Sequence, residues 1–168
     1  MELRNETKEV HHSAEKHPIG ASMADGTITE RWWVDWIQAL LTIHTELDKH
    51  FPESMHRVKE LELDLAESTL TPHINQAAID YVATLTDRNS LEAAAYVFTG
   101  AHLMGGAMTD RALNGRLPCN HLRWKDRQTT LSDWKPLRTK GELKDEATRA
   151  FATVIVILDE IYNLEQKS

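Results

Sequence analysis

The sequence predicts an all-α fold, with residues 1–168 forming a single compact domain of several helices. Apolar residues recur at i, i+3, i+4 and i+7 along most of the chain, whereas the alternating pattern of strands is nearly absent. The 168 residues are the usual size of one domain, and they contain no linker, internal repeat or low-complexity tract that would divide them.

The first half of the chain contains four expected helices. The first runs from about residue 3 to 17 and is broken by "HPIGASMADGT". Thr29 is expected to cap the second. The apolar stripe of this second helix consists of Trp33, Trp36, Ile37, Leu40, Ile43 and Leu47. Pro52 and Pro72 are expected to open the third and fourth helices, because proline is favoured in the first turn.

The second half contains a glycine-containing helix and a long final one. Asn89 or Ser90 is expected to cap the former, and "NGRLPCN" to end it. Residues 119–140 form the least regular part. The last helix covers about residues 142–165. Its expected buried face consists of Phe151, Val154, Ile155, Leu158 and Ile161.

Composition and charge exclude several classes of function. A net charge of −7 argues against a broad nucleic-acid-binding surface. The one cysteine, Cys119, excludes an internal disulfide and a cysteine-based metal cluster. The longest apolar run, at residues 150–158, is too short to span a bilayer, and the charged N-terminal sequence does not resemble a signal peptide. We therefore expect a cytoplasmic protein without a nucleic-acid or membrane partner.

One face of the first helix combines two cations, an imidazole and a carboxylate. Arg4, Lys8, His11 and Glu15 fall within roughly 60° of one another on a regular helix. A histidine that ligates iron needs an acceptor for its other N–H, and Glu15 lies one turn after His11. The cations could meet the acidic groups of a flat ligand. The alternative is a solvated polar face with no ligand.

The glycine-containing helix combines helical spacing with unfavourable residues. Each interior glycine costs about 1 kcal/mol relative to alanine. Ala101, His102, Gly105 and Gly106 share one face, so a flat macrocycle or another helix could pack directly on the backbone. Gly100 lies on the far side and suggests a bend.

Several segments in register resemble the heme oxygenase family. They are "KEVHHSAE", "GTITERWW", "FPESMHRVKELELDLA", "LTPHINQAAIDYV" and "AYVFTGAHLMGGAMTDRAL", and their order and spacing hold from about residue 4 to 118. The resemblance implies a heme held between a proximal and a distal helix.

The resemblance also implies roles for particular residues. His11 matches the proximal iron ligand, and Glu15 matches the acid behind it. The implied contacts of the heme propionates and the heme wall are Arg4, Lys8, Tyr96 and Phe151, with Arg123 and Arg127 as further propionate cations.

The implied reaction is the oxidation of heme by O₂ and electrons to biliverdin, CO and Fe²⁺. Heme is then both cofactor and substrate. The electrons come from an external donor, such as a reductase, a ferredoxin or a flavodoxin-type protein.

The distal segment departs from the family pattern at one position. The usual glycine–aspartate pair reads Ala101–His102, followed by Gly105 and Gly106 as bare backbone beside the heme. We expect His102 to point at or beside the distal heme and to take over the role of the aspartate through water. Ligation of the iron by His102 is the alternative.

Other functions stay open at this stage. The same fold could serve as a heme carrier or sensor without turnover, because the distal aspartate is replaced. A di-iron carboxylate bundle is a further alternative, because Glu9–His12 and Glu53–His56 have the Glu-x-x-His spacing. A non-heme relative of the fold, such as a thiaminase-like protein, would not need His11 together with the glycine-containing helix.

Overall fold

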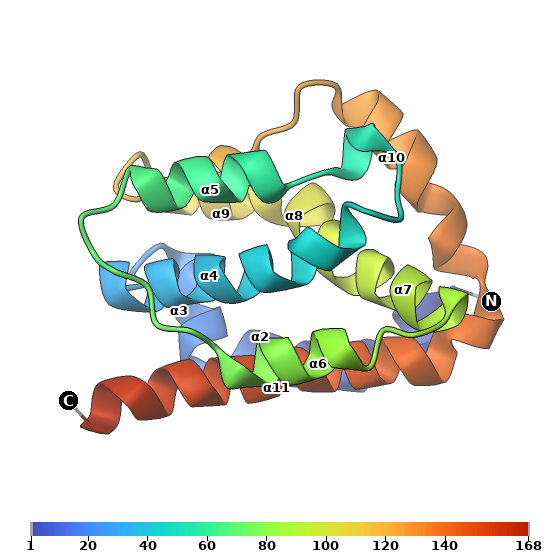
Figure 1. Ribbon diagram of the computed structural model, residues 1–168, viewed down its shortest axis with the longest axis horizontal. Helices are drawn as coiled ribbons and strands as arrows, with labels where there is room; N and C mark the ends of the chain where they lie inside the picture. Colours follow the sequence, from blue (N-terminus) through green and yellow to red (C-terminus); the bar gives the residue numbers. More distant parts are fainter. Residues whose placement is uncertain (1, 168) are drawn as a thin grey trace.

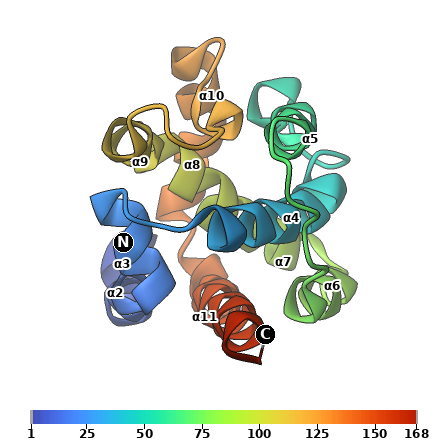
Figure 2. The ribbon, with the colours of Figure 1, turned by 90° about the vertical axis from the view of Figure 1, so that its left-hand side faces the viewer.

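The computed structural model describes residues 2–167, which form helices, turns and no strand. The longest helix, α11 (Lys144–Lys167), runs along one side of the molecule (Figure 1). Viewed along this helix, the chain surrounds a central helix, with α2 and α3 on one flank and α6 on the other (Figure 2). This confirms the all-α fold that the sequence predicts.

The central helix is α4 (Glu30–Leu47), which packs against α5 (Val58–Ala66), α6 (Gln76–Ala83) and α11. Thr29 caps it as predicted, since its side chain accepts a hydrogen bond of 3.2 Å from the Trp32 amide. The predicted apolar stripe is buried along its whole length. Burial of this stripe against three helices contributes to the apolar core.

The N-terminal part contains three helices instead of the predicted one. They are α1 (Leu3–Glu6), α2 (Lys8–Lys16) and α3 (Pro18–Asp25). Thr7 interrupts the first two, and its hydroxyl donates to the Leu3 carbonyl. The segment expected to break the helix starts α3, because Pro18 occupies its first position and the His17 side chain accepts from the Ile19 amide.

The predicted helix starts at Pro52 and Pro72 are wrong by several residues. Pro52 precedes a short 3₁₀ helix, η1 (Glu53–Met55), and α5 follows at Val58. α6 begins at Gln76, with Asn75 as its cap. The Glu160 carboxylate of α11 also accepts from the amides of Gln76 and Ala77. A tertiary contact therefore sets this helix start.

The glycine-containing helix is divided into four segments. They are α7 (Arg88–Ala94), the π-helical η2 (Ala95–Thr99), α8 (Gly100–Met104) and α9 (Gly106–Leu113). Asp87, not Asn89 or Ser90, is the N-cap, and it forms a capping box with Ser90. The bend between α8 and α9 lies at Gly105, and the left-handed Asn114 ends α9.

The segment predicted to be least regular contains short helical pieces. They are η3 (Asn120–Leu122), α10 (Arg127–Trp134), η4 (Lys135–Thr139) and η5 (Gly141–Leu143), which leads into α11. The Trp134 ring lies against the backbone of Gly100, where an added Cβ would be 2.7 Å from the ring. Gly100 therefore gives up its side chain so that a buried tryptophan can approach the helix.

No helix within residues 2–167 combines the length and the apolar character that crossing a bilayer requires.

The contact between Gly100 and Trp134 predicts a measurable loss of stability in Gly100→Ala. Overpacking typically costs about 1–3 kcal/mol. The gain of ~1 kcal/mol in helix propensity offsets only part of this cost. We expect a net loss of about 1–2 kcal/mol by urea unfolding.

The matched control is Gly141→Ala, where a Cβ would meet nothing within 4 Å. Its unfolding free energy should stay within about 0.5 kcal/mol of the parent. Equal urea midpoints for both variants would contradict the proposed packing role of Gly100.

Candidate functional site

Two segments far apart in the sequence meet at both of their ends. At one end, α1 packs on η4, and the Tyr96 hydroxyl of η2 interacts with Thr7. At the other end α3 packs on α9, where a Cβ on Gly26 would overlap the carbonyl of Ala112. Figure 2 shows α2 and α3 on the same side of the molecule as α8 and α9. Residues 2–25 thus lie along the glycine-containing segment.

Between these two ends of contact, side chains on both segments are exposed. On α2 they include His11 and Glu15. On the other segment Ala101 and Gly105 are exposed, and so are two methionines, Met104 (51%) and Met108 (71%). An imidazole and a carboxylate therefore lie on one segment, and an apolar surface with bare backbone on the other.

His11 and Glu15 form the pair that the sequence predicts. The His11 Nε2 atom is 3.0 Å from Glu15 Oε1, and the His11 side chain is 46% exposed. The His11 ring stacks on Phe151 of α11, with 4.8 Å between centroids. His12 is 61% exposed, and its Nδ1 atom makes a longer contact of 3.9 Å to Glu15 Oε2. The carboxylate and the phenyl ring thus orient the His11 ring and leave a ring nitrogen for a ligand.

Tyr96 lies at the end where α1 packs on η4, near two arginines. Its ring stacks on Trp134 with centroids 5.7 Å apart. Burial raises the pKa of its hydroxyl, while the charges of Arg138 and Arg4 act against this rise. The Nε atom of Arg138 is buried without a hydrogen-bond partner. Arg138 is therefore a cation at this end that the sequence did not single out.

The other predicted cations lie elsewhere. Arg123 pairs with Asp110 of α9 through hydrogen bonds of 2.9 and 3.1 Å, and this pairing raises the pKa of the guanidinium. Arg127 donates to the Leu103 carbonyl at the end of α8. Lys8 is exposed on α2, one turn before His11. The structure brings Arg4 and Arg138 to Tyr96, and not Arg123 or Arg127.

His102 does not lie where the sequence predicts. Its ring is 3% exposed and points into the core, and Gly106 is buried against Leu122. The four residues of the expected face divide between two sides of the helix. Ala101 and Gly105, at i and i+4, face outward. His102 and Gly106 lie about 100° further round, toward α4 and η3. The exposed edge is thus narrower than the predicted one.

The three histidines His44, His102 and His121 form a buried histidine cluster behind α8. The Nε2 atoms of His102 and His44 are 3.2 Å apart, and the His121 ring stands edge-on to His102 at 5.1 Å. Burial lowers the pKa of His44 and lowers that of His102 further, below the ordinary value of 6.5. Both rings are therefore neutral at physiological pH.

Asp64 fixes the side of the cluster formed by η3. This fully buried carboxylate accepts from the backbone and side-chain nitrogens of Asn120 and His121, at distances of 2.5 to 3.1 Å. Burial raises the pKa of Asp64, but the hydrogen bonds from His121 and Asn120 lower it by more. The pKa of this carboxyl therefore lies below its ordinary value. A single carboxylate of α5 thus holds η3 against α5.

The described residues do not support a di-iron centre. Within residues 2–167, no group of three or more histidine, cysteine, aspartate or glutamate side chains is placed to bind a metal ion. Glu9 and His12 are exposed on α2, and His56 contacts the Phe51 carbonyl.

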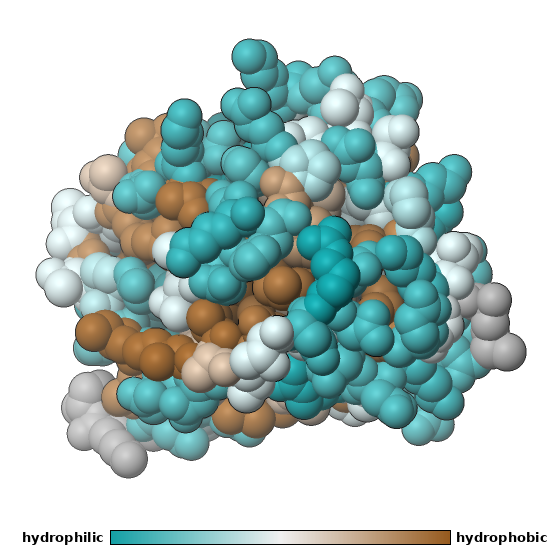
Figure 3. Space-filling model, turned by 45° about the vertical axis from the view of Figure 1, so that its right-hand side comes forward, coloured by the Kyte–Doolittle hydropathy of each residue, from teal (hydrophilic) through white to brown (hydrophobic). Residues whose placement is uncertain are grey.

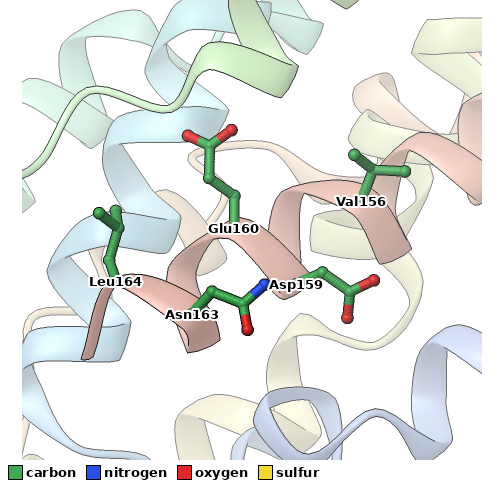
Figure 4. Close-up of a pocket in the computed structure, with 5 residues that line it drawn as sticks. All are labelled: Val156, Asp159, Glu160, Asn163 and Leu164. Carbon is green, nitrogen blue, oxygen red and sulfur yellow. The ribbon is translucent and has the colours of Figure 1, made fainter. Parts of the chain in front are cut away.

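A hollow on the outer face of α11 lacks the features of a ligand site. It has a volume of about 340 Å³, and Figure 4 shows Asp159 and Glu160 on different sides of the helix. Asp159 pairs with His17 and Glu160 caps α6, so both carboxylates have structural partners. Elsewhere, apolar side chains interrupt a mainly hydrophilic surface (Figure 3). The segment pair α2–α8 therefore remains the best candidate site.

The network around Asp64 predicts a large effect of Asp64→Ala on stability. The substitution leaves several buried donors without an acceptor, so we expect a loss of about 3–5 kcal/mol in the free energy of unfolding. Glu67→Ala is the matched control, because Glu67 is exposed and, among the residues that the structure describes, accepts a hydrogen bond from Asn120 Nδ2 alone, at 3.2 Å. Denaturant unfolding checks both. A loss below about 1 kcal/mol in Asp64→Ala would contradict the role assigned to this carboxylate.

Known proteins share the family and the fold of this chain. The family described as heme oxygenase matches residues 1–123. No curated protein matches the chain. The structure of heme oxygenase-1 from the cyanobacterium Synechocystis sp. PCC6803 in complex with heme matches with a TM-score of 0.78 at 18% identity, over 98% of this chain and 92% of that chain. The heme oxygenase from Leptospira interrogans matches with a TM-score of 0.76 at 18% identity, over 94% and 97%.

The family match covers most of the chain, and both structures share its fold over nearly their whole length. The chain belongs to the heme oxygenase family.

Proposed function

We propose that heme binds between α2 and α8 with His11 as the iron ligand, and that the bound heme is oxidised to biliverdin with release of CO and Fe²⁺. One observation carries this proposal. Two segments that meet at both ends leave His11 exposed on one and the bare backbone of Gly105 exposed on the other. Membership of the heme oxygenase family supports the same reaction.

The residues around this interval fit the chemistry of heme. The face of α8 is open, since a Cβ on Gly105 would meet only the Ala101 carbonyl, at 3.4 Å. Phe151, Met104 and Met108 supply apolar surface for a flat macrocycle. Arg4 and Arg138 supply local positive charge for two carboxylates, which the overall charge of −7 would otherwise repel.

The protein contributes orientation and charge to the reaction. Heme supplies, when bound, the iron that activates O₂ and the ring carbon that is oxidised. Glu15 holds one nitrogen of His11, which fixes the plane of the ring and leaves the other nitrogen for the iron. Arg4, Lys8 and Arg138 set the rotation of the macrocycle through its propionates. Electrons come from an external donor, a reductase, a ferredoxin or a flavodoxin-type protein.

A heme carrier is the second candidate function, and the position of His102 favours it. Because this ring is buried, the outward edge of α8 presents Ala101, Met104 and Gly105, which have no polar side-chain group to organise water beside oxygen.

One experiment separates the two candidates. The protein is mixed with one equivalent of hemin, and reductant is added under air. An oxygenase shows a Soret band that decays as a bilin band grows, whereas a carrier keeps its Soret band. Absence of a Soret shift on adding hemin would contradict both.

The assignment of the iron ligand predicts opposite results for two adjacent histidines. His11→Ala should remove the proximal ligand, change the spin state of the bound iron and abolish bilin formation, because the imidazole stacked on Phe151 is lost. His12→Ala is the control, since His12 is 61% exposed and makes only a long contact to Glu15. Absorbance and electron paramagnetic resonance spectra check both. A spectrum altered by His12→Ala and unaltered by His11→Ala would contradict the assignment.

The open face at Gly105 predicts a steric test. Gly105→Leu should leave the free energy of unfolding of the apo protein within about 0.5 kcal/mol, because the new side chain would project into open space. The same side chain should weaken hemin binding at least about tenfold, a change of ~1.4 kcal/mol. Gly141→Leu, with nothing within 4 Å, is the control and should bind hemin like the parent. Unchanged affinity in Gly105→Leu would show that heme does not lie on this face.

A further inference from the structure

Behind the exposed edge of α8, the buried histidine cluster places two imidazoles in direct contact. The Nε2 atoms of His44 and His102 are 3.2 Å apart, and the two residues are 0% and 3% exposed. A contact of this length between two nitrogens is a hydrogen bond only if one nitrogen carries a proton and the other does not. The pair therefore holds one proton between its Nε2 atoms.

The surroundings of His44 indicate which ring donates. His44 Nδ1 is 3.7 Å from Asp48 Oδ1 at the end of α4. This carboxylate favours a proton on Nδ1, so the neutral His44 ring presents a lone pair at Nε2. His102 then donates through its Nε2–H. A second proton on the pair would put hydrogens on both Nε2 atoms and a positive charge in the core, and this hydrogen bond would be lost.

The position of α8 depends on such side-chain contacts. α8 has five residues, follows a π-helical turn and ends at the bend at Gly105. On the side toward α10, the carbonyls of His102 and Leu103 accept from Trp124 Nε1 at 3.4 Å and Arg127 Nη2 at 3.2 Å. On the side that faces α4, the His102 ring forms a hydrogen bond to His44.

We propose that the single-proton hydrogen bond between His44 and His102 positions α8 against α4, and that a second proton on this pair releases α8. Both histidines are positioning residues, since neither reaches the exposed edge on which Ala101 and Gly105 lie. The inference rests on the proposed function only in taking α8 as one wall of the heme site.

Charged and titratable groups on the neighbouring elements either disfavour a second proton on the histidine pair or are held in other hydrogen bonds and ion pairs. Arg57, next to α5, adds positive charge beside both rings, and His121 of η3 stands against His102.

Asp64 of α5 accepts from Asn120 and His121. Asp48 accepts from the amides of Arg57 and Val58 as well as facing His44. Glu60 is paired with Arg57, and His56 lies near Asp48 with its Nε2 atom 2.8 Å from the Phe51 carbonyl.

These contacts give the pH dependence a definite sign. Burial lowers the pKa of His44 and His102 in the folded protein. In the released state each ring regains an ordinary pKa of ~6.5. The hydrogen bond between His44 and His102 therefore stabilises the packed position of α8 fully above about pH 6.5. Below that pH, the equilibrium constant for release of α8 rises by up to about tenfold per pH unit for each ring that takes up a proton on release.

The test is amide hydrogen exchange of the full chain without heme, at about pH 7.5 and about pH 5.5, on either side of the ordinary histidine pKa. After correction for intrinsic exchange, the protection of amides 102–105 should fall at least about tenfold more than that of α11 at the lower pH. In His44→Gln the amide oxygen can accept from His102 in either protonation state. Protection of α8 at the higher pH should then persist, and its loss at the lower pH should shrink several-fold.

Two further variants complete the comparison. His44→Leu cannot accept a hydrogen bond and should lose protection of α8 at both pH values. His50→Gln is the matched control, because His50 follows α4 closely but is exposed and paired with Glu46. It should exchange like the parent.

Two outcomes would overturn the inference. One is a parent protein whose α8 protection changes no more than that of α11 between the two pH values. The other is a His44→Gln variant with the full pH dependence of the parent. If His44→Gln does not fold, ¹⁵N chemical shifts of the histidines in the parent decide. A protonated Nε2 on both rings, or on neither, at neutral pH contradicts the proposal.

Hemin binding, measured separately, tests the proposed function alone. Release of α8 at low pH without hemin binding would support the role of the His44–His102 pair and contradict the proposed heme site. Hemin binding without release would do the reverse.

Discussion

The packing of residues 2–25 against the glycine-containing segment is the constraint on which the rest of the structure depends. Tyr96 and Thr7 meet at one end, and Gly26 meets Ala112 at the other. His11 and Gly105 lie on these two segments between the contacts at either end, and both remain exposed, whereas most large apolar side chains are buried in the core. The glycines make this possible in different ways. Gly26 and Gly100 allow close approach of neighbouring groups, whereas Gly105 leaves the backbone bare.

Each wall of the proposed heme site is supported from behind by a different type of contact. Phe151 of α11 stacks on His11, so the proximal side is held by apolar packing. The distal side is held by buried polar groups, with His102 against His44 and with Asp64 fixing η3. A buried hydrogen-bonded network specifies one geometry but loses stability when a proton is added or a partner removed. The two walls should therefore differ in their sensitivity to pH.

Local patterns predicted the fold class, the capped α4 with its buried stripe, and the His11–Glu15 pair, since each depends on residues within a few turns of one another. Long-range contacts decided the rest. Glu160 of α11 moves the start of α6 beyond Pro72, and the chain path through η4 brings Arg138 to Tyr96. Whether His102 is exposed or buried depends on how many residues around α8 face outward. That number is set by packing against Leu122 and His44, which the sequence of one helix does not contain.

A crystal structure of the protein soaked with or crystallised with hemin tests the central claim most directly. The account predicts iron bonded to His11, the macrocycle lying on the backbone of Gly105, propionates directed toward Arg4, Arg138 and Tyr96, and His102 still bonded to His44. Iron bonded to His12 or to any histidine of the buried cluster would contradict it, as would a macrocycle bound on the outer face of α11.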